Sequence, residues 1–335
     1  MDLDSLLEKT ETLPKPPEDL SQASLVTHAA CMDGAGCAII FLMLGGKEEN
    51  IHYVGAGTLR KFVDENHLMK GDRFVIFADV GITSAEDADA LEKRGNCVLI
   101  DHHLSAKHMQ DRSWCYIDCD GNSGSACACK LFLSYMAYSY ESWSRVFMEN
   151  HEILHLTNAI DDNDRWLQKN PRSAEMAAYM TFVGQKRFIK AFIDLSRWGD
   201  NFSSLSPNKT IWYEWEETVL EIIQDQKNKN IERLLRDVIV HDIEMDNEMI
   251  PVGYVVSSEQ NVSQLLMTVL QRFPEVKVAA QISVDKGSIS MRSRGDVDVS
   301  ALAKMFHGGG HRSASGHPLP KNLSKLIIEA CHGDW

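Results

Sequence analysis

Imidazole and carboxylate side chains recur in this sequence at positions from which they could bind divalent metal ions. They follow apolar runs or cluster together: His28, Asp33, Asp79, Asp101, His102, His103, Asp161, Asp162 and Asp164. Ligands of these two kinds that arrive from several strand ends suit Mn²⁺ or a comparable ion, and a bridging carboxylate would make a two-metal site. A single aspartate at a strand end often only caps the next helix, but that explanation is weak for the whole set. The sequence therefore predicts a metal site.

Short apolar runs precede most of these side chains: residues 24–28, 73–79 and 97–101. Segments with helical spacing separate them: residues 34–44, 58–65 and 84–94. Continuous apolar runs are typical of strands buried on both faces, and the β-α-β order predicts a parallel sheet. Because ligands bind at the carboxyl ends of parallel strands, we expect His28, Asp79 and the Asp101-His102-His103 triplet to converge in space.

The rest of the chain predicts further helices and a second domain. Helices are expected at residues 125–139 and 142–160, and a long amphipathic helix at 210–235. Strand-like runs then occupy residues 250–256, 276–284 and 288–292, with a helix at 262–273. We therefore predict an α/β fold in which a parallel-sheet N-terminal domain and a smaller α+β C-terminal domain are joined by a helical connector. The expected boundaries are a polar tail at 1–22, the first domain at 23–208, the connector at 209–246 and the second domain at 247–335.

The charge balance limits the partners of the protein. Its 335 residues include 34 Lys and Arg against 48 Asp and Glu, a formal charge of -14, which argues against coating of long nucleic acid. Residues 1–22 lack the apolar core of a secretory signal, and the longest apolar stretch, residues 37–44, is too short to span a bilayer. Eight cysteines scattered through expected strands and helices fit the buried thiols of a reducing compartment. We expect a cytoplasmic protein with no membrane partner.

The order of these motifs resembles that of the DHH phosphoesterases. The segments that carry the resemblance are residues 26–34 (VTHAACMDG), 77–79 (FAD), 100–103 (IDHH), the acidic cluster before Trp166, and 308–311 (GGGH). A single DHH triplet would be common by chance, but the ordered set at these spacings is specific and extends over nearly the whole chain. The superfamily includes RecJ-type nucleases, nanoRNases, cyclic-dinucleotide and phosphoadenosine phosphatases, exopolyphosphatases and family II pyrophosphatases.

The resemblance implies roles for individual residues. It implies two divalent cations, most simply Mn²⁺, with His28 and Asp79 on the first metal. The second metal would be held by Asp33, a bridging Asp79, His102 and Asp162. We prefer Asp162 to Asp161 because the sequence DNDRW that begins at position 162 resembles the D-x-D-x-W form of some members. Asp101 would orient its neighbours, and His103 would contact the scissile phosphate.

One position departs from the family pattern. Many members have D-x-D-G in the first motif, whereas this chain has CMDG at residues 31–34. Cys31 therefore stands where a carboxylate ligand of the first metal is usual. A thiolate is a softer ligand, which would shift the preference toward zinc or iron or leave the first metal weakly held. We expect activity to be retained, and a nucleotide-binding protein with weakened catalysis is an alternative.

The glycine run near the C-terminus resembles the DHH-associated C-terminal domain. Consecutive glycines let the backbone approach a ligand closely, and their N–H groups can surround an anion. The resemblance implies that substrate is bound by Arg292, Arg294, Gly308, Gly309, Gly310 and His311. The pyrophosphatases of the superfamily have a different, basic signature at this position, which disfavours that activity.

A competing metal motif lies between the two regions. Residues 151–155 (HEILH) satisfy the H-E-x-x-H pattern of zinc proteases, with both histidines on one helical face and Glu152 as the base. The glycine turn that metzincin-like sites need is absent, because Asn158 holds that position. The pattern recurs by chance on ordinary helices, so we disfavour a protease.

These observations predict a metal-dependent phosphodiesterase that hydrolyses short oligonucleotides or small nucleotide phosphoesters by two-metal hydroxide attack, in a cleft between the domains. Arg292 or Arg294, His103 and His311 would neutralise phosphate oxygens. An exopolyphosphatase, which cleaves phosphoanhydrides, is an alternative with the same metal chemistry. We expect no long duplex nucleic acid as a partner, and the sequence leaves a homo-oligomer open.

Overall fold

The computed structural model describes residues 12–55, 71–82, 84–119, 126–193, 214–245, 248–259, 261–295 and 297–319. The chain divides into two compact units, Met1–Leu220 and Glu221–Trp335. The division falls within helix α11 (Glu214–Leu234), which lies in the segment expected to connect the domains. The expected helix at 58–65 lies outside the described residues.

The first unit contains a parallel sheet of five strands in the order β2-β1-β3-β4-β5. The strands are β1 (Ala23–His28), β2 (Ile51–Val54), β3 (Phe74–Ala78), β4 (Cys97–Asp101) and β5 (Cys115–Ile117). The predicted parallel sheet and its three expected strands are confirmed. The sequence pattern did not predict β2 and β5, because strands of four and three residues are too short to show a clear apolar run.

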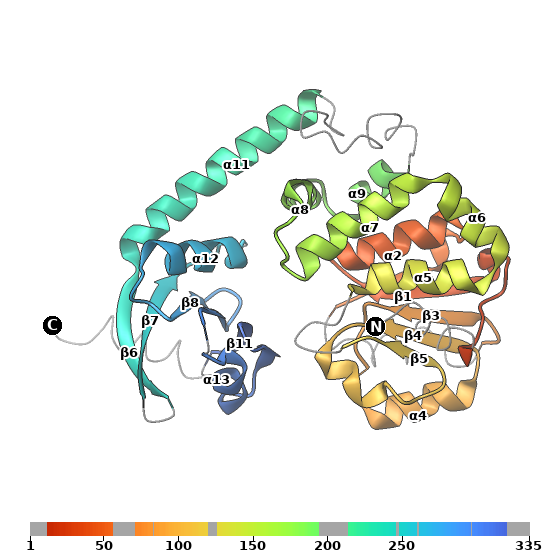
Figure 1. Ribbon diagram of the computed structural model, residues 1–335, viewed down its shortest axis with the longest axis horizontal. Helices are drawn as coiled ribbons and strands as arrows, with labels where there is room; N and C mark the ends of the chain where they lie inside the picture. The colour runs from red at the N-terminus through yellow and green to blue at the C-terminus, as the bar shows by residue number, and fades with distance from the viewer. Residues whose placement is uncertain are drawn as a thin grey trace. The chain divides into compact units, whose positions relative to one another are not determined.

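Helices cover both faces of this sheet. They are α2 (Met32–Met43), α4 (Ala85–Arg94), α5 (Ala128–Ser139), α6 (Glu141–Glu149), α7 (His151–Asp164), α8 (Pro171–Val183) and α9 (Gln185–Ile193). Figure 1 shows α2, α5 and α7 on one face and α4 on the other. Strand side chains alternate between two cores, so that Leu25 packs on the α2 side and Val26 on the α4 side. Three short 3-10 turns complete the described part of this unit: Leu20–Gln22, Glu48–Asn50 and Leu104–Met109.

One expected helix, at 142–160, is two helices in the structure. Helices α6 and α7 meet at Asn150, whose backbone is not helical. The Asn150 side chain donates a hydrogen bond to the Val146 carbonyl at 2.7 Å, so it ends α6 while α7 begins at the next residue. Asparagine competes in this way for backbone hydrogen bonds and favours helix ends.

The junction of β1 and α2 requires a glycine. Helix α2 begins directly after the turn that follows β1, with Cys31 as its N-cap residue. A Cβ atom on Gly34 would lie 2.2 Å from the carbonyl oxygen of His28, which is too close for any side chain. The first turn of α2 therefore packs against the carboxyl end of β1, where a ligand would bind.

The second unit is a six-stranded mixed sheet in the order β10-β11-β9-β8-β7-β6. Its elements are β6 (Ile239–Met245), β7 (Glu248–Val256), α12 (Val262–Arg272), β8 (Val278–Ser283), β9 (Ser288–Ser293), α13 (Val299–Met305), β10 (Gly309–His311) and β11 (Ala314–Pro318). A 3-10 turn, Leu235–Asp237, leads from α11 into β6. The predicted α+β unit is confirmed, but the prediction that the connector is helical up to residue 246 is wrong for β6. This strand lies at the sheet edge and is mostly exposed, so it lacks the apolar alternation that would have revealed it.

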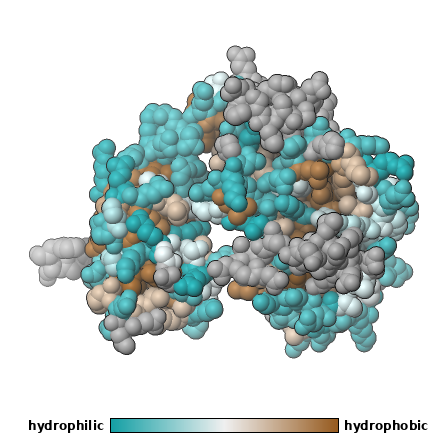
Figure 2. All heavy atoms as spheres, in the orientation of Figure 1, coloured by the Kyte–Doolittle hydropathy of each residue, from teal (hydrophilic) through white to brown (hydrophobic). Residues whose placement is uncertain are grey.

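Hydrophilic side chains cover much of the face shown in Figure 2, with smaller apolar patches between them. Among the described residues, no helix combines the length and the apolar character needed to cross a bilayer.

Candidate active site

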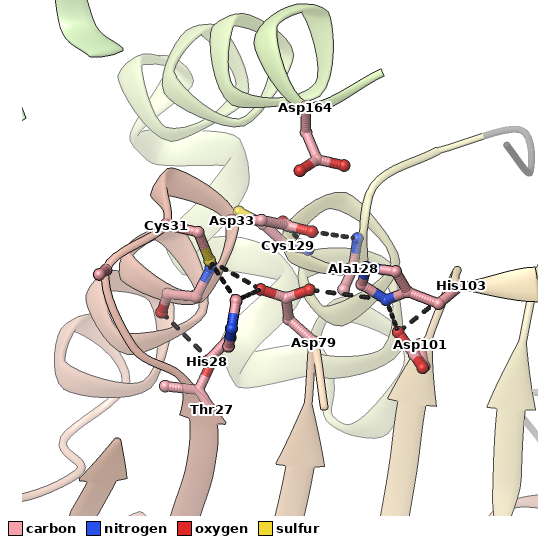
Figure 3. A network of polar contacts seen from close by, with 12 residues as sticks. Thr27, His28, Cys31, Asp33, Asp79, Asp101, His103, Ala128, Cys129 and Asp164 are labelled. Atoms are coloured by element: carbon pink, nitrogen blue, oxygen red, sulfur yellow. Dashed lines mark hydrogen bonds and ion pairs between the residues drawn. The ribbon is translucent and has the colours of Figure 1, made fainter. Parts of the chain in front are cut away.

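Polar side chains converge at the carboxyl ends of three adjacent strands. His28 is the last residue of β1, Asp79 follows β3 directly, and Asp101 ends β4 and precedes His102 and His103. Because β1, β3 and β4 are neighbours in the sheet, these side chains meet as the sequence predicted (Figure 3). Asp79 adopts a left-handed backbone conformation, with φ at 59°, which is costly for a residue other than glycine and is typical of functional positions.

Three overlapping groups of potential metal ligands result. They are His28, Cys31 and Asp79; Asp33, His102 and Asp164; and Asp79, Asp101, His102 and His103. Within each group the ligand atoms lie within 4.8 Å of one another. Asp79 belongs to two groups, as expected of a bridging carboxylate.

In the first group a sulfur atom lies between a nitrogen and an oxygen. The Cys31 thiol donates to Asp79 Oδ2 at 3.0 Å, and its Sγ lies 3.2 Å from His28 Nδ1. The backbone N–H of Gly34 donates to the same sulfur at 3.2 Å, which makes Cys31 the N-cap of α2. The role of Cys31 in starting α2 thus fixes its sulfur beside His28 and Asp79.

The second group lies where α2, α5 and α7 meet. Asp33 Oδ2 accepts from the Ala128 N–H at 2.9 Å and Oδ1 from the Cys129 N–H at 2.6 Å, at the first turn of α5. His102 Nε2 lies 3.5 Å from Asp33 Oδ2 and 3.2 Å from Asp164 Oδ2. Asp33 is therefore held by a helix N-terminus while it faces the imidazole of His102.

The structure does not bring Asp162, the expected ligand, into these groups. Its Oδ1 accepts from the backbone N–H of Lys169 at 2.7 Å and of Asn170 at 3.2 Å, and its Oδ2 accepts from the Ser173 hydroxyl at 2.6 Å. These bonds hold the turn between α7 and α8. Asp164, the last residue of α7, takes the place beside His102. Two residues along a helix are about 200° apart, so the two aspartates face different neighbours.

Asp161 also has a structural environment. Its Oδ1 accepts from the Cys127 N–H at 2.8 Å, and its Oδ2 lies 3.4 Å from Lys130 Nζ and 3.5 Å from Arg165 Nη1. Asp161 therefore stabilises the start of α5, where positively polarised N–H groups favour a carboxylate.

Asp101 orients the side chain of His103, two residues further along the chain. Asp101 Oδ1 lies 2.7 Å from His103 Nδ1 and accepts from the His102 N–H at 2.9 Å. Burial lowers the pKa of His103, but the hydrogen bond to Asp101 and its charge outweigh burial and raise this pKa to about 9. The His103 imidazole lies at the edge of the carboxylate cluster, where its hydrogen bond to Asp101 favours the protonated form. Burial, followed by the charge of His103, lowers the pKa of His28.

The buried carboxylates fit divalent cations. Burial, and then the charge of Asp164, raises the pKa of Asp33 to about 8. Burial, and then the charge of Asp33, raises the pKa of Asp79 well above its usual range. These shifts show that several anions are crowded away from water, which is unfavourable unless cations offset their charge. Two divalent ions held by imidazole, carboxylate and thiolate ligands would supply that charge.

Gln185, the first residue of α9, is a site residue that the sequence did not reveal. Its Oε1 accepts from the Ala30 N–H at 2.9 Å, and its Nε2 donates to the His28 carbonyl at 3.1 Å. Ala30 has a left-handed backbone, with φ at 61°. Gln185 therefore holds the strained turn that carries His28 and Cys31. Nothing in the sequence indicates that Gln185, about 155 positions from Ala30, contacts this turn.

The expected substrate-binding residues lie on the sheet of the second unit. Across β9, β11 and β10, Arg292 pairs with Ala314 and Ala314 with His311, so all three side chains share one face. Arg292 donates to the Ser263 hydroxyl at 2.7 Å, whereas Arg294 donates to the Pro274 carbonyl at 3.2 Å. The structure thus brings Arg292 and His311 to one face and directs Arg294 to a loop carbonyl.

Strand packing accounts for two of the three glycines. A Cβ on Gly308 would lie 2.1 Å from the Gly316 carbonyl oxygen, and Gly310 has a φ of 135°. Gly309 has open space around it. The run therefore forms the start of a strand, β10, in addition to any role in ligand binding.

The alternative zinc-protease motif lies on α7. The side chain of His151 lies outside the described part of the structure, and no ligand group found among the described residues includes His155. The helix instead delivers Asp164 to the site described above.

Comparisons with known proteins agree with this geometry. Residues 24–159 match the DHH family, N-terminal domain. The chain is 23% identical over 314 residues to Oligoribonuclease NrnB of Bacillus subtilis (strain 168), which covers 89% of this chain and 73% of that protein. It is 24% identical over 243 residues to a 3',5'-cyclic-nucleotide phosphodiesterase of Helicobacter pylori (strain ATCC 700392 / 26695), which covers 65% of this chain and 66% of that protein.

A solved structure shares the fold. The pGpG-specific phosphodiesterase PggH from Vibrio cholerae aligns with a TM-score of 0.50 and 14% identity, over 92% of this chain and 97% of that one. The matched segment contains the carboxyl ends of β1, β3 and β4, where the candidate ligands lie. Residues 24–159 are therefore similar to the N-terminal domain of the DHH family.

Proposed function

We propose that the protein is a metal-dependent phosphodiesterase that hydrolyses short oligonucleotides. The observation that carries the proposal is the convergence of overlapping ligand groups at the carboxyl ends of β1, β3 and β4, which lie in the segment that matches the DHH family. Relatives named as an oligoribonuclease and as cyclic-nucleotide and pGpG-specific phosphodiesterases support a nucleotide phosphodiester as the substrate.

The two groups would hold one cation each. His28, Cys31 and Asp79 would form the first site, and Asp33, His102 and Asp164 the second, with Asp164 in place of the expected Asp162. Asp79 remains the proposed bridge between the two sites. When bound, two divalent cations activate water and neutralise charge at a transferring phosphoryl group. Mn²⁺ remains our proposal where the ligands are imidazole and carboxylate groups, and other divalent ions remain open at the group that contains Cys31.

The protein's own groups would position the phosphate. Asp101 holds the imidazole of His103 by its hydrogen bond, and His103 offers a positive charge to phosphate oxygens. Electrostatic stabilisation and positioning make up most of phosphoryl-transfer catalysis. Gln185 keeps the turn that carries His28 in place.

The second unit carries the other proposed substrate-binding residues. Arg292 and His311 share one sheet face, and cationic or donor side chains of this kind suit phosphate and base edges. We retain Arg294, Gly308, Gly309 and Gly310 in the proposed substrate-binding set. We also propose a cytoplasmic location, because most of the described cysteines are buried, which fits the thiols of a reducing compartment.

The test is the release of mononucleotide from a 5′-labelled RNA dinucleotide in the presence of Mn²⁺. Asp79→Asn should abolish release, whereas Asp242→Asn, at an exposed position on β6, should leave it unchanged. Parallel reactions with polyphosphate distinguish phosphodiester from phosphoanhydride hydrolysis. Phosphate release from polyphosphate with no release from RNA would overturn the proposal. Binding of the dinucleotide without any hydrolysis would identify a nucleotide-binding protein instead.

A further inference from the structure

The two ligand groups differ in the chemistry of their donor atoms. The first group contains the sulfur of Cys31, whereas the second, formed by Asp33, His102 and Asp164, contains only nitrogen and oxygen. Thiolate ligands favour zinc, iron and other thiophilic ions, while carboxylates favour hard ions such as Mn²⁺. The same protein therefore offers two neighbouring sites with different intrinsic preferences.

The spacing in the first group suits a small tetrahedral ion. Sγ of Cys31 lies 3.0 Å from Asp79 Oδ2 and 3.2 Å from His28 Nδ1, and the latter two atoms are 3.9 Å apart. Metal bonds of about 2.0–2.3 Å at a tetrahedral ion separate neighbouring ligand atoms by about 3.3–3.6 Å. The two separations from sulfur are shorter than that range and the nitrogen–oxygen separation is longer, each by about 0.3 Å or less.

The direction of the sulfur is set by the fold. Cys31 caps α2 through the Gly34 N–H, and its sulfur lies within hydrogen-bond distance of Asp79 Oδ2 (Figure 3). A cation could take the place of the thiol hydrogen of Cys31, because it would bind the two atoms that this hydrogen now links, Cys31 Sγ and Asp79 Oδ2. His28 and Cys31 are partly exposed, which leaves one side of the group open to a further ligand.

We propose that the two sites select different metals: the site formed by His28, Cys31 and Asp79 binds a thiophilic ion such as Zn²⁺ through the Cys31 thiolate, and the site that contains Asp33, His102 and Asp164 binds Mn²⁺. This inference rests on the proposed function in assuming two bound ions. It assigns Cys31 a direct ligand bond and predicts a mixed-metal protein.

Spectroscopy of the full-length protein tests the sulfur bond. Protein loaded with Co²⁺ should show a thiolate-to-cobalt charge-transfer band in the near ultraviolet, which Cys31→Ser and Cys31→Asp should abolish. Both replacements keep an oxygen acceptor at the N-cap position, so α2 should still form. Cys97→Ser is the matched control, because Cys97 is a buried thiol outside the ligand groups, and it should keep the band.

X-ray absorption and metal analysis provide independent readouts. Zinc-loaded wild-type protein should show a sulfur neighbour at about 2.3 Å, and the Cys31 variants should not. With Mn²⁺ in large excess over Zn²⁺, the wild type should retain zinc at the first site and manganese at the second, because Zn²⁺ binds nitrogen and oxygen ligands more tightly than Mn²⁺ at equal concentrations. Cys31→Asp should weaken zinc binding at the first site by about 10–100-fold or more, the range seen when even indirect partners of a metal are removed.

The outcomes separate this inference from the proposed function. A missing band, or a band that survives in both Cys31 variants, overturns the inference, even where the same samples hydrolyse RNA dinucleotide with Mn²⁺. A Cys31-dependent band supports it, even in a protein that shows no hydrolysis, in which case the proposed function fails alone. If a Cys31 variant does not fold, the zinc–sulfur distance in the wild type decides.

Discussion

Exchanging Asp162 and Asp164 separately, each for asparagine, tests which member of the acidic cluster binds metal. Asp162 is buried, with 4% exposure, and accepts three hydrogen bonds in the turn between α7 and α8. The side chain of Asp164 is 27% exposed and faces His102. The structure therefore predicts that Asp162→Asn damages folding and that Asp164→Asn damages metal binding.

The magnitudes follow from these contacts. Asparagine at position 162 replaces one acceptor oxygen by an NH₂ group, which would face a hydrogen-bond donor instead of accepting from it. This change should lower the free energy of unfolding by about 2–4 kcal/mol. For a unit of this size, the melting temperature should fall by about 5–15 °C. Asparagine at 164 leaves the fold intact but removes a charged ligand, so the affinity for the second metal should fall about 100-fold or more.

Thermal unfolding and Mn²⁺ titration of both variants provide the assay, with dinucleotide hydrolysis measured at saturating metal. Asp162→Asn should melt early yet bind metal as the wild type does below its melting temperature. Without metal, the Asp164→Asn variant should melt at the wild-type temperature. Added Mn²⁺ should raise its melting temperature only slightly. The opposite pattern, with metal lost at unchanged stability in Asp162→Asn, would refute the assignment of Asp164.

Three further predictions concern the neighbouring groups. Gln185→Ala should lower hydrolysis about 10–100-fold by misplacing the turn it holds, with Lys186→Ala as the exposed control; equal activities would contradict this. In metal-free protein, Asp101→Asn should lower the pKa of His103 from about 9 toward about 6.5, measured by NMR, and an unchanged value would show that Asp101 does not raise this pKa. The pKa of Asp33 is about 8 in the folded protein and about 3.9 in the unfolded chain. The metal-free protein should therefore lose stability as the pH rises between these values. Melting temperatures that rise over this pH range would contradict the raised pKa.

Local patterns were enough to predict where most of the proposed ligands lie. His28, Asp79 and Asp101 each end or follow a continuous apolar run, and the topology of parallel sheets then places such residues at one edge. Cys31 was predicted from its place in the motif, and the structure sets its sulfur beside His28. These positions depend on strand order, which the β-α-β pattern encodes.

Contacts that depend on helix phase or on distant partners were not predictable in this way. The choice between Asp162 and Asp164 depends on which face of α7 points toward His102, and that rotation is set by packing rather than by sequence spacing. Gln185 reaches the first motif only because α9 packs on α2. The edge strand β6 was missed because it lacks the apolar pattern of a buried strand.

Asp33 shows why the fold and the site cannot be separated at every position. Its two oxygens accept N–H groups of Ala128 and Cys129 at the start of α5, and one of them also faces His102. Any substitution at Asp33 would remove hydrogen bonds of the fold together with a metal ligand, so a loss of activity would not distinguish the two causes. Asp164 is partly exposed and lies at the end of a helix, where a change of charge leaves the core untouched. Substitution of Asp164 therefore tests the second metal site more cleanly than substitution of the more deeply buried Asp33.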